Sequence, residues 1–292
     1  MNRTIARVMA FLAAILWGTS FVIIRWGLLF VPALQFVLLR FLFASLIIII
    51  ILSKNGQLRG VLNVLTSKSV IIASIFNALG YIFQFLGQQY TRATNASLLI
   101  NLSGVFVAVL AHFLLKEKLS TLGEIGVTAA FVGASLLITK GDIAGFFSLY
   151  FLGDFLCLLA GFFWAIYIVE SKKITEKKFN DLQLLAAWFL YTTIFSAPLA
   201  IYQGIVFLTI EAILAILYTA VFCTVIAFLF WFGSLKGLEA TTSSIYFIIE
   251  VIISAILEQI IFGLNLTFIE IFGACLAVIG VIITDISFSK RL

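Results

Sequence analysis

Two stretches of this sequence share one spacing of small residues: GVTAAFVG at 126–133 and GACLAVIG at 273–280. In both, a glycine, an alanine and a second glycine follow at intervals of four and three residues. The first stretch lies near the end of the first half of the chain, and the second lies near the end of the second half. A pattern that recurs at the same place in both halves indicates an internal duplication.

Further identities occur at the same offset along the chain. Matches of Leu or Ile count for little, because such residues coincide by chance in apolar sequence. The matches that carry weight pair Trp17 with Trp164, Ala93 with Ala240, Thr94 with Thr241, Ser97 with Ser244 and Ala130 with Ala277. The sequence therefore predicts two related halves, residues 1–140 and 141–292.

The composition is that of a membrane protein. Of 292 residues, 63% are hydrophobic and 11% are charged, whereas about a quarter of an ordinary soluble domain is charged. The net charge of +5 is spread over short loops, so we interpret it as a topology signal and expect no nucleic-acid partner. The sequence thus predicts a chain that crosses the lipid bilayer many times.

Neither a metal site nor a cofactor is expected. Cys157, Cys223 and Cys275 lie far apart in apolar runs, which predicts free buried thiols. His112 is the single histidine. No nucleotide-binding loop, nucleophile elbow or zinc-protease motif occurs.

Ten apolar stretches are long enough to cross a bilayer about 30 Å thick as helices. Backbone groups in lipid must be satisfied within the segment, and no stretch alternates as a barrel strand would. The expected spans are residues 8–28, 34–52, 70–88, 95–115, 121–139, 153–170, 182–202, 211–235, 241–262 and 268–285.

The basic residues between these spans fall mainly on one side. That side holds Arg3, Arg7, Lys54, Arg59, Lys68, Lys116, Lys118, Lys172, Lys173, Lys177, Lys178, Lys236, Lys290 and Arg291. The other side holds Arg25, Arg92 and Lys140. Positively charged loops stay in the cytoplasm, so we expect both termini there and the protein in the plasma (inner) membrane of a prokaryote.

Five spans per half is an odd number, so the second half enters the membrane from the opposite side. The expected fold class is therefore all-α, with ten transmembrane helices in a 5+5 inverted-topology repeat. Many secondary transporters use this arrangement for alternating access around a site near the bilayer midplane. The alternative is that the duplication only built a larger helical bundle.

The chain resembles the drug/metabolite transporter superfamily, in its EamA-type branch of ten helices. The resemblance rests on WGTSFVIIRWGLLFVPALQFVLLRF at 17–41, with Trp17, Gly18, Pro32 and Arg40, on LSGVFVAVLAHFLLKEKLSTLGEIGVTAAFVGASLLI at 102–138, and on the echo of that stretch at 240–281. It implies export or exchange of amino acids, drugs or other small metabolites. The chain departs from the family pattern at Gly104 and Val251, where prolines are usual, and at 263–265.

A polar stripe marks the third span. Ser74, Asn77, Tyr81, Gln84 and Gln88 follow one another at helical spacing and so share one face. The stripe either lines a cavity for a polar solute or holds neighbouring helices together by hydrogen bonds.

The fourth span carries a weaker stripe of small and polar residues. It comprises Ser97, Asn101, Gly104, Ala108 and His112, whose small members allow close helix packing. His112 is either an interfacial residue or a proton relay.

Aromatic side chains give further candidates. Trp17 and Trp164 lie within their helices, away from the interfacial aromatic level, and could line a pocket for ring-bearing or cationic solutes. Tyr81, Tyr167 and Tyr246 carry hydroxyls that need partners, which favours them over phenylalanine as cavity residues.

Arg40 and Glu250 are ionisable residues inside spans, where a charge is costly. Arg40 could bind a carboxylate or phosphate, or it could pair structurally with a helix end. Glu250 lies near the centre of its span and could bind a proton, a substrate ammonium group or Arg40. Glu258 shares its face and is expected to reach water at the outer interface.

Together these observations predict a secondary transporter of a small organic solute, such as an amino acid or a drug-like compound, working as a monomer or homodimer. The alternatives are a membrane-embedded enzyme acting on lipid-linked substrates and a membrane sensor that does not transport.

Overall fold

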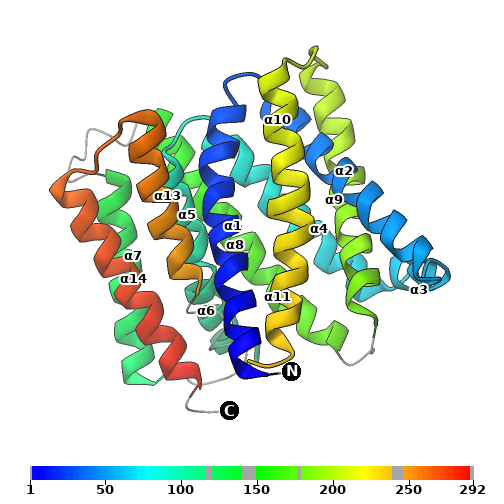
Figure 1. Ribbon diagram of the computed structural model, residues 1–292. Helices are drawn as coiled ribbons and strands as arrows, with labels where there is room; N and C mark the ends of the chain where they lie inside the picture. The colour runs from blue at the N-terminus through cyan, green and yellow to red at the C-terminus, as the bar shows by residue number, and fades with distance from the viewer. Residues whose placement is uncertain (1, 116–119, 140–148, 176–178, 239–245, 290–292) are drawn as a thin grey trace.

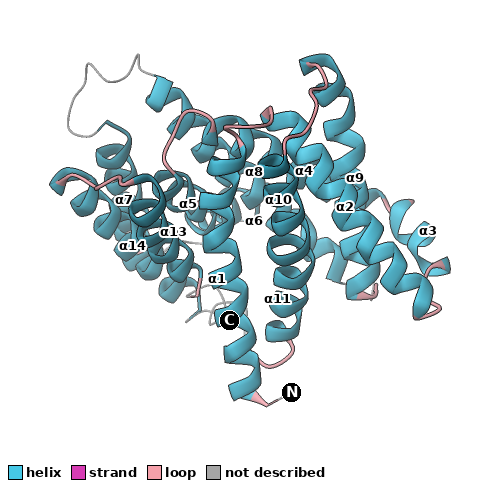
Figure 2. Ribbon diagram, turned by 45° about the horizontal axis from the view of Figure 1, so that its top comes forward, coloured by secondary structure: helices cyan, strands magenta, loops and turns pink. Residues whose placement is uncertain are grey.

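The computed structural model describes residues 2–115, 120–139, 149–175, 179–238 and 246–289. These residues form helices joined by short turns, with no strand among them (Figures 1 and 2). The helices are α1 Arg3–Gly27, α2 Ala33–Lys54, α3 Arg59–Leu65, α4 Lys68–Gln88, α5 Ala93–Asn101, α6 Ser103–Leu115, α7 Thr121–Thr139, α8 Leu149–Thr175, α9 Asp181–Gln203, α10 Ile210–Tyr218, the π-helix η2 Thr219–Ile226, α11 Ala227–Leu235, α13 Phe247–Phe262 and α14 Phe268–Ser289.

Six helical stretches are long and apolar enough to cross a membrane: α1, α2, α4, most of α8, α9 and the continuous run from α10 to α11. Further apolar helices are shorter, namely 93–107, 121–136 and 268–284. The expectation of an all-helical, multi-pass membrane protein is confirmed, while the number ten and the inverted repeat stay predictions. Figure 1 places the start of α1 and the end of α14 at the same end of the bundle.

The span expected over 95–115 is helical, with an interruption at Leu102 that separates α5 from α6. The sequence Asn101-Leu-Ser103-Gly104 explains the interruption. Asn and Ser side chains compete for backbone hydrogen bonds and glycine weakens a helix. Here the Asn101 side-chain amide donates to the backbone oxygen of Ser97 at 2.8 Å.

The expected span over 211–235 is helical but not uniform. Its middle third is the π-helix η2, in which the Thr224 hydroxyl donates to the backbone oxygen of Thr219 at 2.9 Å. Such wide turns are rare and occur frequently at functional sites. This one faces α1 and α2, and both helices pack on it.

The small-residue stretches quoted at the outset pack against each other, as α7 and α14 (Figure 1). A Cβ atom built on Gly133 would lie 2.4 Å from the backbone nitrogen of Ala277, and one built on Gly280 would lie 2.3 Å from that of Ala130. The two backbones are therefore in direct contact, and any larger side chain would force them apart.

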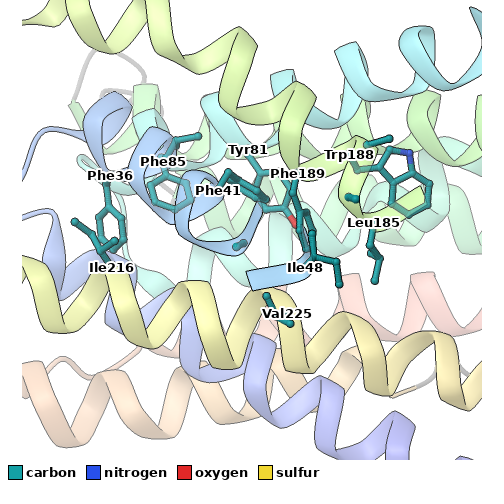
Figure 3. Packing of buried hydrophobic residues seen from close by; sticks show 14 of the residues in the cluster. Phe36, Phe41, Ile48, Tyr81, Phe85, Leu185, Trp188, Phe189, Ile216 and Val225 are labelled. Atoms are coloured by element: carbon teal, nitrogen blue, oxygen red, sulfur yellow. The ribbon is translucent and has the colours of Figure 1, made fainter. Parts of the chain in front are cut away.

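The remaining helices enclose two apolar clusters. One cluster joins α2, α4, α9 and α10–α11 around Phe36, Phe41, Tyr81, Phe85 and Phe189, drawn in Figure 3. The second gathers side chains of α1, α5, α7, α8, α13 and α14. Trp164 packs against both clusters.

Candidate functional site

Arg40 is the largest fully buried side chain, with 1% of its surface exposed. It projects from α2 onto the π-helix. Its Nε donates to the hydroxyl of Thr224 at 2.8 Å and its Nη2 donates to the backbone oxygen of Cys223 at 3.4 Å. Its Nη1 has no hydrogen-bond partner in the described part of the chain. One edge of the guanidinium is thus bound by η2, and the other edge is left with a free donor.

Three aromatic rings surround this guanidinium. Its central carbon lies 5.5 Å from the ring centroid of Phe41, 5.6 Å from that of Tyr81 and 5.7 Å from that of Phe85. Ring faces attract a cation, more strongly when water is excluded. Within the described residues no carboxylate lies within 4.0 Å of Arg40, so the pairing with Glu250 that the sequence suggested is not formed. The rings and η2 take the place of a counter-charge.

Glu250 lies in the first turn of α13 and is 6% exposed. One of its carboxylate oxygens accepts a long hydrogen bond, 3.4 Å, from the side-chain amide of Asn101. Among the described residues no cation lies within 4.0 Å of it. Tyr81 lies within electrostatic range of both Glu250 and Arg40. Within the described residues the bundle therefore holds two buried ionisable side chains, one basic and one acidic, each without an ionic partner, with a tyrosine near both.

The polar stripe on α4 is buried at all five positions. Asn77 donates to the Thr192 hydroxyl on α9 at 3.3 Å. Gln84 donates to Gln88 at 3.1 Å, and Gln88 donates to the backbone oxygen of Phe21 on α1 at 2.9 Å. These contacts favour the interhelical interpretation for the amide side chains of the stripe. The Ser74 hydroxyl is buried without a partner in the described residues.

Trp17 and Trp164 lie at helix junctions. Trp17 donates from its indole nitrogen to the backbone oxygen of Cys223 at 3.1 Å, the same oxygen that Arg40 approaches. Trp164 lies over Gly80, where a Cβ atom would come within 2.7 Å of its indole nitrogen, and meets Tyr81 edge-on at 5.1 Å. Both tryptophans thus reach the neighbourhood of Arg40 from different halves of the chain.

Two further tyrosines were expected at the site. Tyr167 packs edge-on against Trp188, 5.2 Å away. Tyr246 is partly buried just before α13. The side chain of His112 and the residues Thr241 and Ser244 lie outside the described residues. Cys275, expected to be buried, is exposed.

Sequence reasoning missed an ionic network at the C-terminal end of α1, where Arg25 lies. Glu258, expected to be hydrated, is 2% exposed and pairs with Arg25. It also accepts hydrogen bonds from the backbone nitrogens of Ala93 and Thr94, at 2.8 and 3.1 Å, and from the Thr94 hydroxyl at 2.6 Å. The first turn of α5 has unpaired backbone donors that favour a carboxylate, and Glu258 supplies it. The expectation of a hydrated Glu258 was therefore wrong.

Two more carboxylates complete this network. Asp154 on α8, 0% exposed, accepts hydrogen bonds from the Thr91 hydroxyl and, at 3.3 Å, from the Asn95 amide. Arg92 pairs with Glu270 on α14 at 3.2 Å. Carboxylates from α13, α8 and α14 thus meet around the residues that begin α5. We call Arg25, Glu258, Asp154, Arg92 and Glu270 the α5 clamp.

The other end of the bundle is hollowed. A cavity of about 580 Å³ lies between α1, α9 and α11. Its lining is Met9, Gln57, Phe179, Asn180, Asp181, Leu182, Leu185, Leu229, Phe232, Gly233 and Lys236. Lys236 pairs with Asp181 there at 3.3 Å, and both side chains are well exposed. The described residues contain no group of three His, Cys, Asp or Glu side chains that could hold a metal ion.

Comparison with known proteins agrees with this architecture. The model of the EamA-like transporter family matches residues 4–139 and 151–284. A protein of Archaeoglobus fulgidus named as an uncharacterized transporter is 32% identical over 94% of both chains. The transporter YyaM of Bacillus subtilis, also named uncharacterized, is 26% identical over 83% of this chain and 81% of its own.

A crystal structure of a protein 20% identical in sequence aligns over 99% of both chains with a TM-score of 0.68, which shows a shared fold. The family match covers most of the chain in two stretches, and the relatives carry the name of transporters. The chain therefore belongs to the EamA-like transporter family.

Proposed function

We propose that this protein is a secondary transporter that moves a small organic solute across the plasma membrane by alternating access between two inverted five-helix halves. The observation that carries the proposal is the buried centre, where the basic side chain of Arg40 and the acidic side chain of Glu250 lie without an ionic partner among the described residues. Ionisable groups inside a membrane protein are costly and mark substrate or proton pathways.

The pattern of helix contacts supports the inverted repeat. In the sequence offset, α1 corresponds to α8, α4 to α10–α11, and α5–α6 to α13. The contacts follow this correspondence: α1 packs on α11 as α8 packs on α4, and α1 packs on α13 as α8 packs on α5. The pairs α2 with α9 and α7 with α14 each join equivalent helices of the two halves. A pseudo-twofold relation of this kind would let one half rock against the other around a central site.

The chemistry of the centre suggests the solute class. The free Nη1 donor of Arg40 suits a carboxylate, and the rings of Phe41, Tyr81 and Phe85 suit an apolar remainder. Glu250 suits an ammonium group or a proton. An amino acid or a similar small zwitterion would engage both. Trp17, Trp164 and Asn101 would line the same region. The expected direction of transport is export or exchange.

The two ends of the bundle indicate which conformation of the transport cycle the structure represents. The α5 clamp joins α1, α5, α8, α13 and α14 at the end predicted to lie outside. The cavity of about 580 Å³ lies at the end predicted to face the cytoplasm. We therefore assign the conformation as closed to the outside, with its vestibule on the cytoplasmic side.

Counterflow in proteoliposomes tests the proposal. Vesicles loaded with a pool of amino acids should accumulate a labelled member of that pool through the wild-type protein. Glu250→Gln should lose this exchange or its pH dependence over about pH 5 to 8, while the exposed Glu124→Gln on α7 should behave as wild type. Equal exchange by Glu250→Gln and wild type at every pH would rule out a role for this carboxylate. If no charged or zwitterionic solute is exchanged, the proposal that the protein transports amino acids or similar zwitterions is wrong.

A further inference from the structure

The short helix α3 lies at the membrane surface. The span α2 ends at Lys54 and the span α4 begins at Lys68, so the thirteen residues between them, including α3, cannot extend far from the bilayer. Figure 1 shows α3 at the margin of the bundle, beyond α2 and α9, and Figure 2 shows it there from a second direction.

This helix is held in one orientation. Val61 and Val64 are buried on its inner side. The hydroxyl of Tyr191 on α9 donates to the backbone oxygen of Leu65 at 2.6 Å, and the side-chain amide of Gln183 donates to that of Gln57 at 2.9 Å. These bonds attach both ends of the α3 segment to α9, so its outer face is a fixed part of the surface.

The outer face combines apolar and basic side chains. Leu58 is 42% exposed and Leu62, one helical turn later, is 68% exposed. Arg59 lies between them and is exposed, as are Lys54 and Lys68 on either side. We call these five residues the α3 surface. In the described part of the chain, none of its three cations has a carboxylate within 4.0 Å.

The surrounding sequence gives these cations no acidic partner nearby. There is no Asp or Glu anywhere from Met1 to Lys116. Lys236 provides a contrast, since it lies at the same end of the bundle and is paired with Asp181 at 3.3 Å. The α3 surface is therefore a local excess of positive charge beside exposed leucines, placed where lipid headgroups lie.

We propose that the α3 surface binds the phosphate headgroup of an anionic phospholipid. Leu58 and Leu62 enter the outer part of the acyl-chain layer, while Lys54, Arg59 and Lys68 surround the headgroup phosphate. Amphipathic helices with basic residues bind anionic membranes in this way, by apolar burial together with charge attraction. Long basic side chains reach the headgroup level while their stems stay apolar. This site is separate from the central charges and does not depend on what the protein transports.

Quenching by labelled lipid tests the proposal locally. A fluorophore is attached to Asn63→Cys, exposed on α3, in a protein whose three native cysteines are replaced by serine. The protein is reconstituted in an equal mixture of phosphatidylcholine and phosphatidylglycerol, with a nitroxide on one lipid or the other. Labelled phosphatidylglycerol should quench several-fold more strongly than labelled phosphatidylcholine. The preference should fade towards about 1 M salt, where charges are screened.

Matched variants separate the site from the general membrane environment. The triple variant Lys54→Gln, Arg59→Gln, Lys68→Gln should lower the apparent affinity for phosphatidylglycerol roughly tenfold or more. Lys236→Gln, which removes a paired cation, should leave it unchanged. Leu62→Asn should weaken binding, whereas Leu29→Asn, at a leucine with the same 68% exposure elsewhere, should not.

Three outcomes would overturn the proposal. Equal quenching by the two lipids would mean that the basic residues act only as topology signals. A preference that persists in the triple variant would place the lipid elsewhere. Displacement of phosphatidylglycerol by millimolar inorganic phosphate would show a site for free anions instead. A melting curve of each variant is the control that the variant is folded.

Discussion

At the scale of the residue, the backbone oxygen of Cys223 accepts hydrogen bonds from both Trp17 and Arg40. The Thr224 hydroxyl likewise has a second bond, to the backbone of Thr219. If the guanidinium of Arg40 were removed, the backbone oxygen of Cys223 would keep its hydrogen bond from Trp17. The Thr224 hydroxyl would keep its hydrogen bond to the backbone oxygen of Thr219. This arrangement allows a structural and a substrate-binding role of Arg40 to be told apart.

We expect Arg40→Met to keep the fold and lose function. Methionine fills the apolar space among the three rings, and replacing a buried charge by an apolar side chain is often neutral for stability. Transport of a carboxylate-bearing solute should fall at least about tenfold, the loss expected from about 1.4 kcal/mol of binding energy. Uptake assays and melting curves measure the two effects. A large fall in melting temperature with unchanged uptake per folded molecule would make Arg40 structural.

Glu258→Gln should destabilise the protein by about 2 to 4 kcal/mol, because it removes a buried carboxylate that pairs with the partly buried Arg25 and accepts hydrogen bonds from the start of α5. The new amide would also bring a donor towards the donors of Ala93 and Thr94. Thermal unfolding in detergent measures the loss. The surface variant Glu124→Gln should stay within about 0.5 kcal/mol of wild type. A melting point for Glu258→Gln equal to that of wild type would contradict the importance of the α5 clamp.

Some of these residue roles were within reach of the sequence and others were not. Arg40 and Glu250 stand out in any sequence, because a charge in an apolar run is costly and needs a reason. Glu258 stood out equally, but its partner Arg25 is 233 positions away and no local pattern connects them. The stretch from Thr91 to Asn95 could have indicated this contact, because it is typical of a helix N-terminus, and a helix N-terminus favours a nearby carboxylate.

At the scale of the element, helix existence was predictable and helix continuity was not. Apolar length alone located the six helical stretches that are long and apolar enough to cross a membrane, whereas the interruption at Leu102 and the π-turn of η2 depend on a few residues inside apolar runs. The α3 helix escaped prediction because seven residues are too few for an apolar span. The repeat of GVTAAFVG as GACLAVIG indicated duplication, and the structure adds that the two copies touch.

That contact predicts a strong effect of added volume. Gly133→Val should destabilise the α7–α14 pair by about 2 kcal/mol or more, since its new atoms would meet the backbone of Ala277. Melting temperature measures this loss. Val132→Leu, on a neighbouring position that is 47% exposed, adds volume on the outer side of the same helix and should be nearly neutral. Equal stability of the two variants would contradict the close packing.

At the scale of the whole molecule, the predicted orientation can be tested by labelling from outside. In a protein without its native cysteines, Asn180→Cys and Lys236→Cys should resist membrane-impermeant thiol reagents in intact cells. Tyr202→Cys, which lies at the other end of α9 and is 93% exposed, should react readily. Efficient labelling of position 180 or 236 together with protection of position 202 would invert the assignment of inside and outside. Labelling after cell lysis controls for access.

The backbone contact between α7 and α14 has a mechanical consequence. Where a layer of side chains lies between two helices, those side chains can change rotamer as the helices slide. Where Gly126, Gly133 and Gly280 meet the opposite backbone there is no such layer to rearrange, so the pair resists both sliding and separation. We therefore expect the α7–α14 pair to act as a fixed pivot, which stays nearly at rest while the helices around Arg40 and Glu250 move.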